Sequence, residues 1–76
     1  MTKAYVLMTV EIGRAGDVYG ALSHIEGVSE VSVVAGTYDL VAVITAENAR
    51  AIGALVMDRI QRVEGVMGTV TLIAIG

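Results

Sequence analysis

The sequence predicts an α+β sandwich in which strands and helices follow one another in the order βαββαβ. The first observation is an internal repeat: Ile25–Val34 (IEGVSEVSVV) and Val63–Ile73 (VEGVMGTVTLI) share a Glu-Gly-Val turn followed by an apolar strand, and the two turns lie 38 positions apart. The second is that β-branched apolar segments alternate with segments of helical periodicity. The chain of 76 residues therefore reads as two copies of one strand-helix-strand unit.

The first unit opens with a strand over Ala4–Glu11, which is rich in β-branched and apolar residues. The turn GRAGD then leads into a helix that begins at about Asp17. We expect Gly27 to end this helix as a left-handed cap, and Val28–Ala35 to form the second strand. The residues expected to face the core at helical spacing are Val18, Ala21, Leu22 and Ile25.

The second unit follows a tight hairpin at Gly36–Tyr38, so the second strand should pair antiparallel with a third strand over Leu40–Thr45. A second helix begins at about Glu47 and is expected to end at Gly65. Met67–Ile75 forms the last strand, and right-handed crossovers complete a ferredoxin-like fold. The apolar positions on one face of this helix are Ile52, Leu55, Val56, Ile60 and Val63.

Both faces of the predicted sheet are apolar. A sheet covered by helices on one face and by water on the other should alternate apolar and polar residues. The third strand instead places Leu40, Ala42 and Ile44 on one side and Val41 and Val43 on the other. Because two helices cover only one face, we expect the other face to pack on the sheet of a second copy, as in dimeric α/β-barrel proteins.

The composition argues against several kinds of function. The chain has no cysteine and a single histidine, His24, so we expect no disulfide, no metal site and no cofactor. Five basic residues among eight acidic ones, with a net charge of −3, form no patch for nucleic acid or an anionic membrane. The absence of a signal segment and of a membrane-length apolar run predicts a cytoplasmic protein. The chain offers His24 no cysteine and no second histidine, so no catalytic residue is expected.

Three polar residues on the strands have two interpretations each. Asp39, at the start of the third strand, is typical of an Asx turn that bonds its own hairpin, yet it also offers a carboxylate to a ligand. Thr69 and Thr71 alternate on the last strand and therefore share one face. They are either ordinary strand residues or hydroxyls that bind a ligand carboxylate.

The hairpin GTYDL (Gly36–Leu40) resembles the Gly-x-Tyr/Phe-Asp-Leu signature of the effector-binding domain of the Lrp/AsnC family of transcriptional regulators. The two EGV turns and the closing TVTLI strand agree with this resemblance, which covers about residues 3–75. It implies a ferredoxin-like RAM (regulation of amino-acid metabolism) domain that dimerises through its sheets, forms octamers or decamers, and binds amino acids between neighbouring dimers. We expect one stand-alone domain over residues 1–76, without the family's helix-turn-helix.

The resemblance also implies where an effector binds. Asp39 would accept a hydrogen bond from the ammonium of an amino acid, and N–H groups of the turn at Gly36 would bind its carboxylate. Thr69 or Thr71 of a neighbouring subunit would assist. The complete set of implied ligand-binding residues is Gly36, Thr37, Tyr38, Asp39, Leu40, Thr69 and Thr71.

The expected function is that of a non-enzymatic amino-acid sensor linked to transcriptional regulation. It would act as a homo-oligomer and co-assemble with full-length Lrp/AsnC regulators. Two alternatives stay open. One is a small dimeric α/β-barrel enzyme of the monooxygenase or isomerase kind, although such enzymes need polar or aromatic residues where this sheet has mostly Val, Leu, Met and Ala. The other is a structural oligomer that binds no ligand.

Overall fold

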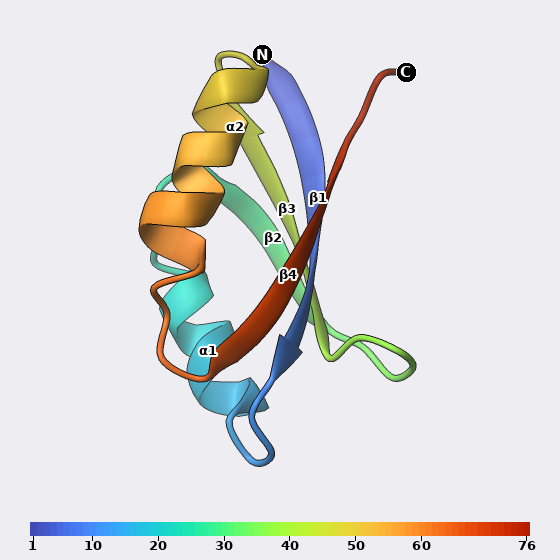
Figure 1. Ribbon diagram of the computed structural model, residues 1–76, viewed down its shortest axis with the longest axis vertical. Helices are drawn as coiled ribbons and strands as arrows, with labels where there is room; N and C mark the ends of the chain where they lie inside the picture. The colour runs from blue at the N-terminus through green and yellow to red at the C-terminus, as the bar shows by residue number, and fades with distance from the viewer.

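A computed structural model describes residues 1–76 as one antiparallel sheet with its helices on one face (Figure 1). The strand order is β2-β3-β1-β4, and all neighbouring strands pair antiparallel. The predicted ferredoxin-like βαββαβ fold is confirmed. None of the helices combines the length and the apolarity that crossing a bilayer requires. The elements are β1 (Thr2–Val10), α1 (Ala15–Leu22), β2 (Val28–Val33), β3 (Leu40–Ala46), α2 (Ala49–Leu55), the π-helical turn η1 (Val56–Ile60) and β4 (Val66–Ile73).

The helices differ from the prediction at their ends. The second helix begins later than Glu47, because the side-chain Oδ1 of Asn48 accepts a hydrogen bond from the Ala51 N–H at 2.8 Å and so caps the first turn. Both helical segments also end earlier than predicted, at Leu22 and Ile60. After each end the chain tightens into turns with i→i−3 hydrogen bonds.

The glycines of the two EGV turns therefore lie in the turns that follow the helices, and they do not cap the helices themselves. Gly27 has φ +98° and Gly65 has φ +101°, a region that favours glycine. Each glycine carbonyl also accepts a hydrogen bond from the end of a strand: Gly27 from the Thr45 N–H at 2.9 Å, and Gly65 from the Glu11 N–H at 2.8 Å. The sequence repeat thus corresponds to two equivalent junctions between a turn and a strand.

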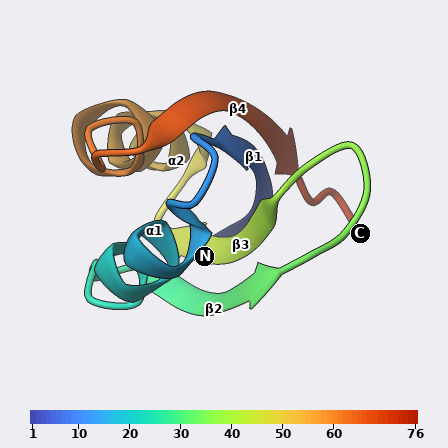
Figure 2. The ribbon, with the colours of Figure 1, turned by 90° about the horizontal axis from the view of Figure 1, so that it is seen from below.

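The hydrophobic core lies between the helices and the sheet, which curves around them (Figure 2). The predicted inward stripe of the second helix is confirmed, since its members are buried or packed against the core. In the first helix Ala21 was predicted wrongly: it lies on the flank of the stripe and is exposed. The buried core residues are Ala4, Val6, Met8, Val18, Leu22, Ile25, Leu40, Ala42, Ile44, Ile52, Val56 and Ile60.

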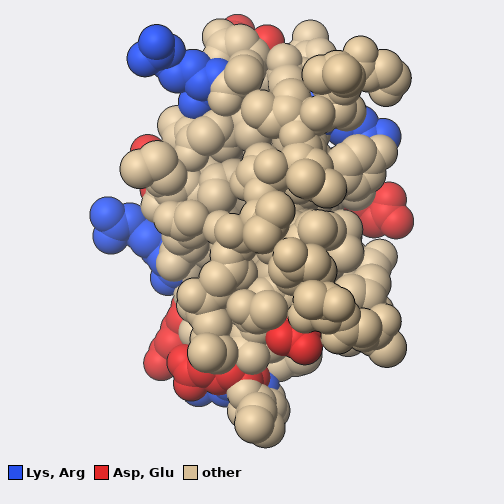
Figure 3. Space-filling model, turned by 45° about the vertical axis from the view of Figure 1, so that its right-hand side comes forward, with Lys and Arg blue, Asp and Glu red and all other residues tan.

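The helix-free side of the sheet, here called the open face, is apolar over β4, β1 and β3, as predicted. The strand register aligns its side chains in rows, with Tyr5 opposite both Val43 and Leu72. Tyr5 is 36% exposed and Leu72 is 51% exposed. Figure 3 shows this side as a broad uncharged surface with most charged groups at its margins. The apolar residues of the open face are Tyr5, Leu7, Val41, Val43, Val70 and Leu72.

Candidate functional site

Residues 34–39, here called loop 34–39, join β2 to β3 and extend away from the helices at the end of the sheet where β1 ends (Figures 1 and 2). The predicted antiparallel pairing of β2 with β3 is confirmed, but the connection is longer than the predicted Gly36–Tyr38 turn: β2 ends at Val33 and not at Ala35, whereas β3 begins at Leu40 as predicted. A hydrogen bond from the Val34 N–H to the Asp39 carbonyl, 2.9 Å long, closes the loop at its base. Between these two residues, the N–H groups of residues 35–38 make no hydrogen bond within the chain.

Asp39 is attached to β1 through both its backbone and its side chain. Its N–H donates to the carbonyl of Met8 at 2.8 Å, and its Oδ2 accepts from the N–H of Val10 at 2.9 Å. The side-chain bond links residues 29 positions apart. It is therefore a contact between strand segments and not the local Asx turn that Asp39 alone would suggest. The second carboxylate oxygen, Oδ1, makes no hydrogen bond within the chain.

The end of the β1–β3 ladder explains this bond. Alternate residues of a strand direct their backbone polar groups to the same neighbour, so Val10 faces β3 as Met8 does. Regular pairing of β1 with β3 ends at Met8 and Leu40, and the residues directly before Leu40 form the loop. The Asp39 carboxylate takes the place of the missing backbone acceptor. An unpaired, partly buried N–H would cost about 1–3 kcal/mol.

The other residues of the predicted site occupy different environments. Gly36 and Thr37 are exposed at the tip of loop 34–39, and Tyr38 is half-buried. Leu40 is fully buried in the core between sheet and helices, so only its backbone is available near the loop. Gly36, Thr37, Tyr38 and Asp39 thus come together at one end of the sheet.

Within one chain, Thr69 and Thr71 are not brought to the loop. They lie opposite Met8 and Val6, so their side chains are on the helix-covered side of the sheet. The Thr69 hydroxyl accepts a hydrogen bond from Nε2 of Gln61 at 2.9 Å. Thr69 is separated from Leu40 by β1, which places their Cα atoms about 10 Å apart.

Two open hollows, of about 280 and 320 Å³, lie beside the outer strands β2 and β4. Every residue of the second hollow stands 38 positions after a residue of the first, so the hollows are products of the internal repeat. The spacing of the EGV turns indicates that these two regions are equivalent, but no pattern in the sequence indicates that either of them is concave. The first is lined by Tyr19, Ser23, Val28, Ser29, Glu30 and Val31, and the second by Gln61, Val66, Met67, Gly68 and Thr69.

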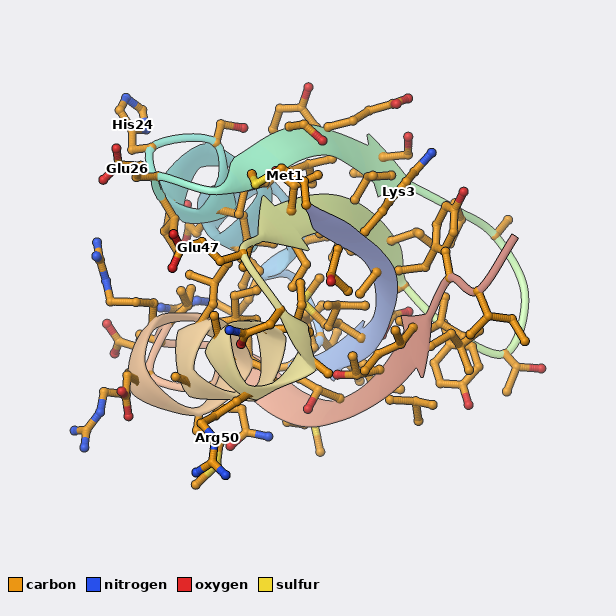
Figure 4. The ribbon with its side chains drawn as sticks, turned by 90° about the horizontal axis from the view of Figure 1, so that it is seen from above. Met1, Lys3, His24, Glu26, Glu47 and Arg50 are labelled. Carbon is orange, nitrogen blue, oxygen red and sulfur yellow. The ribbon has the colours of Figure 1, made fainter.

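The charged groups outside the loop do not converge on a site. Glu26 and Glu64 precede strands that run in opposite directions, so they lie at opposite ends of the sheet. Glu64 pairs with Arg14 at 3.6 Å and its side chain is 87% exposed. Figure 4 shows His24, Glu26 and Arg50 directed outward into solvent. No group of three or more His, Asp or Glu side chains is placed to hold a metal ion.

Comparisons with known proteins agree on one family. A family model described as the Lrp/AsnC ligand binding domain matches residues 3–76. An uncharacterised HTH-type transcriptional regulator of Pyrococcus horikoshii is 42% identical over 53 residues, which are 70% of this chain and 35% of that protein. The chain thus spans about a third of the length of the curated relatives it matches. Both this relative and the matching family are regulatory.

Solved structures share the fold over almost the whole chain. The crystal structure of TTHA0845 from Thermus thermophilus is similar with a TM-score of 0.93 at 33% identity, covering 100% of this chain and 95% of that one. A transcriptional regulator from Neisseria meningitidis, crystallised as a complex with L-Met, has a TM-score of 0.87 at 13% identity. That match covers 99% of this chain and 50% of the Neisseria chain, and at this identity it shows the fold alone.

Proposed function

This chain belongs to the Lrp/AsnC ligand-binding domain family, and on that premise we propose that it senses an amino acid. Residues 1–76 act as one ligand-binding domain without catalytic activity, in the cytoplasm, where transcriptional regulators work. The proposal is supported by the complex of the Neisseria regulator with L-Met, a protein that shares this fold. The signal passes to transcription through assembly with HTH-type regulators of the family.

The observation that carries the proposal is that loop 34–39 contains both a carboxylate oxygen and several backbone N–H groups that make no hydrogen bond within the chain. Oδ1 of Asp39 accepts a charge-assisted hydrogen bond from the ammonium of the amino acid. The unbonded N–H groups of residues 35–38 bind its carboxylate, as consecutive amides do in anion-binding turns. Thr69 or Thr71 of a neighbouring copy completes the site, because neither reaches the loop of its own chain.

The proposed assembly is a homodimer that joins into an octamer or a decamer. Its dimer contact is the open face, whose rows of Tyr, Leu and Val side chains are the apolar surface that a second sheet would cover. The chain is small, with 55% hydrophobic and 17% charged residues, so burial of that apolar surface in a dimer contact would be favourable.

The proposal is tested by thermal denaturation in the presence of each proteinogenic amino acid, followed by calorimetric titration. A ligand at about 100 times its Kd stabilises the folded state by about 2.7 kcal/mol. Asp39→Asn is expected to weaken binding about tenfold or more, because the charge is lost. The matched control is Asp58→Asn, which removes an exposed charge from η1. If no amino acid raises the melting temperature, the sensor function is refuted and a structural oligomer becomes the better interpretation.

A further inference from the structure

We infer that Asp39 is the positioning residue of loop 34–39: the hydrogen bond from the Val10 N–H to its carboxylate, here called the Asp39–Val10 bond, holds the loop open for the ligand. The inference rests on the proposed function in one respect, that this loop is the binding site. It adds a second role for the same carboxylate, in which Oδ2 shapes the site and Oδ1 remains for the ligand.

The end of β1 has no other partner for Val10 on the side of β3. Val10 is the last residue of β1, and the β1–β3 register ends two residues earlier. On the side of β4 the register shifts between Thr9 and Val10, and the following bond runs from the Glu11 N–H to the Gly65 carbonyl. The Val10 amide therefore has a single hydrogen-bond acceptor in the chain, and it is a side chain.

The base of the loop depends on the same residue. Three hydrogen bonds fix Asp39: its N–H donates to the Met8 carbonyl, its carbonyl accepts from the Val34 N–H, and its Oδ2 accepts from the Val10 N–H. The first two lie directly beyond the last paired residue of β3, Leu40, and a regular hairpin would have equivalents of them. The third is specific to Asp39. Since residues 35–38 make no backbone hydrogen bonds of their own, this bond sets how the loop departs from the sheet.

Two substitutions separate positioning from charge. Asparagine keeps a side-chain oxygen at the same distance along the chain, so Asp39→Asn retains an acceptor for Val10 but loses the negative charge. Asp39→Ala removes both. A residue that served only the ligand would leave the Val10 amide unaffected in either variant.

The first test uses the ligand-free protein. In the wild type, a scalar coupling across the hydrogen bond between the Val10 nitrogen and the Asp39 carboxylate carbon should be detectable by NMR. Amide exchange should be slow at Val10 in the wild type and in Asp39→Asn, and about tenfold faster or more in Asp39→Ala. The Val6 amide, in the middle of β1, reports global opening and is the internal reference. Absence of the coupling overturns the inference even if Asp39→Ala fails to fold. Equal Val10 exchange, relative to Val6, in the wild type and Asp39→Ala also overturns it.

The second test adds L-methionine and distinguishes this inference from the proposed function. If Asp39→Asn protects Val10 and binds L-methionine as the wild type does, positioning is supported and the ammonium contact is refuted. If Asp39→Asn protects Val10 but binds poorly, both roles are supported. If the Asp39–Val10 bond is present but neither L-methionine nor another amino acid binds the wild type, the bond fixes the loop and the proposed sensor function fails.

Discussion

Replacing Gly65 by alanine is expected to destabilise the fold by about 2–5 kcal/mol, through two separate effects. At φ +101° an L-residue with a Cβ costs about 1–2 kcal/mol. The new Cβ would also lie 3.0 Å from Cγ2 of Val18 and 3.2 Å from Cβ of Arg14. Both atoms are close to the backbone of α1 or of its N-terminal cap. The helix would therefore have to move to relieve these close contacts, and overpacking of this kind costs about 1–3 kcal/mol.

The matched control is Gly53→Ala, in the interior of α2. No atom lies within 4 Å of the Cβ that this substitution adds, and the position is exposed. Alanine there should stabilise the fold by about 0.5–1 kcal/mol, because glycine loses more conformational entropy in a helix. The two glycine-to-alanine changes are thus predicted to have opposite signs.

Urea denaturation followed by circular dichroism measures the stability change of both variants. All proteins are compared at one concentration, because association would add to the apparent stability. For a domain of this size, a loss of 1 kcal/mol corresponds to a fall in melting temperature of about 4–8 °C, so Gly65→Ala should lower the melting temperature by roughly 8–40 °C. A Gly65→Ala protein within about 0.5 kcal/mol of the wild type would refute the requirement for glycine in the second EGV turn.

Three further substitutions test other parts of the structure. Asn48→Ala removes the cap of α2 and should lower the free energy of unfolding by about 1 kcal/mol in urea denaturation, whereas Asn48→Asp should retain most of the stability that the cap contributes. An equal loss in both variants would contradict the capping role. Ile52→Ala, in the core, should cost about 2–5 kcal/mol by the same assay, and a loss below about 1 kcal/mol would contradict its packing. Leu72→Glu, on the open face, should leave the circular dichroism spectrum unchanged but shift sedimentation towards the monomer; unchanged association would argue against the proposed sheet-to-sheet contact.

Periodicity carried most of the fold prediction. The alternation of β-branched segments with helical stripes identified every strand and helix, and the stripe containing Ile52 and Ile60 is buried as expected. These patterns are readable because they arise from burial of one face, which repeats along the chain. Element ends were less accurate, since they depend on single hydrogen bonds such as that from the Ala51 N–H to Asn48.

The candidate site was only partly accessible to sequence reasoning. The GTYDL motif directed attention to Asp39, but nothing in the sequence indicated Val10, because Val10 contributes a backbone N–H that every residue except proline possesses. The placement of Thr69 on the helix-covered side likewise follows from its register with Met8. Alternation on one strand shows that two residues share a face, but it does not say which face the helices cover.

Four features could be read from the amino-acid sequence: the order of the elements, the two EGV turns, the apolar character of both sheet faces and the resemblance to a family of regulators. All of these depend on local periodicity or on short motifs. Two relations became apparent only in the folded chain: the Asp39 carboxylate accepts a hydrogen bond from the Val10 amide, and Thr69 lies across β1 from the loop. These relations join residues distant in the chain, and their geometry is set by where the β1–β3 ladder ends, which no local pattern encodes.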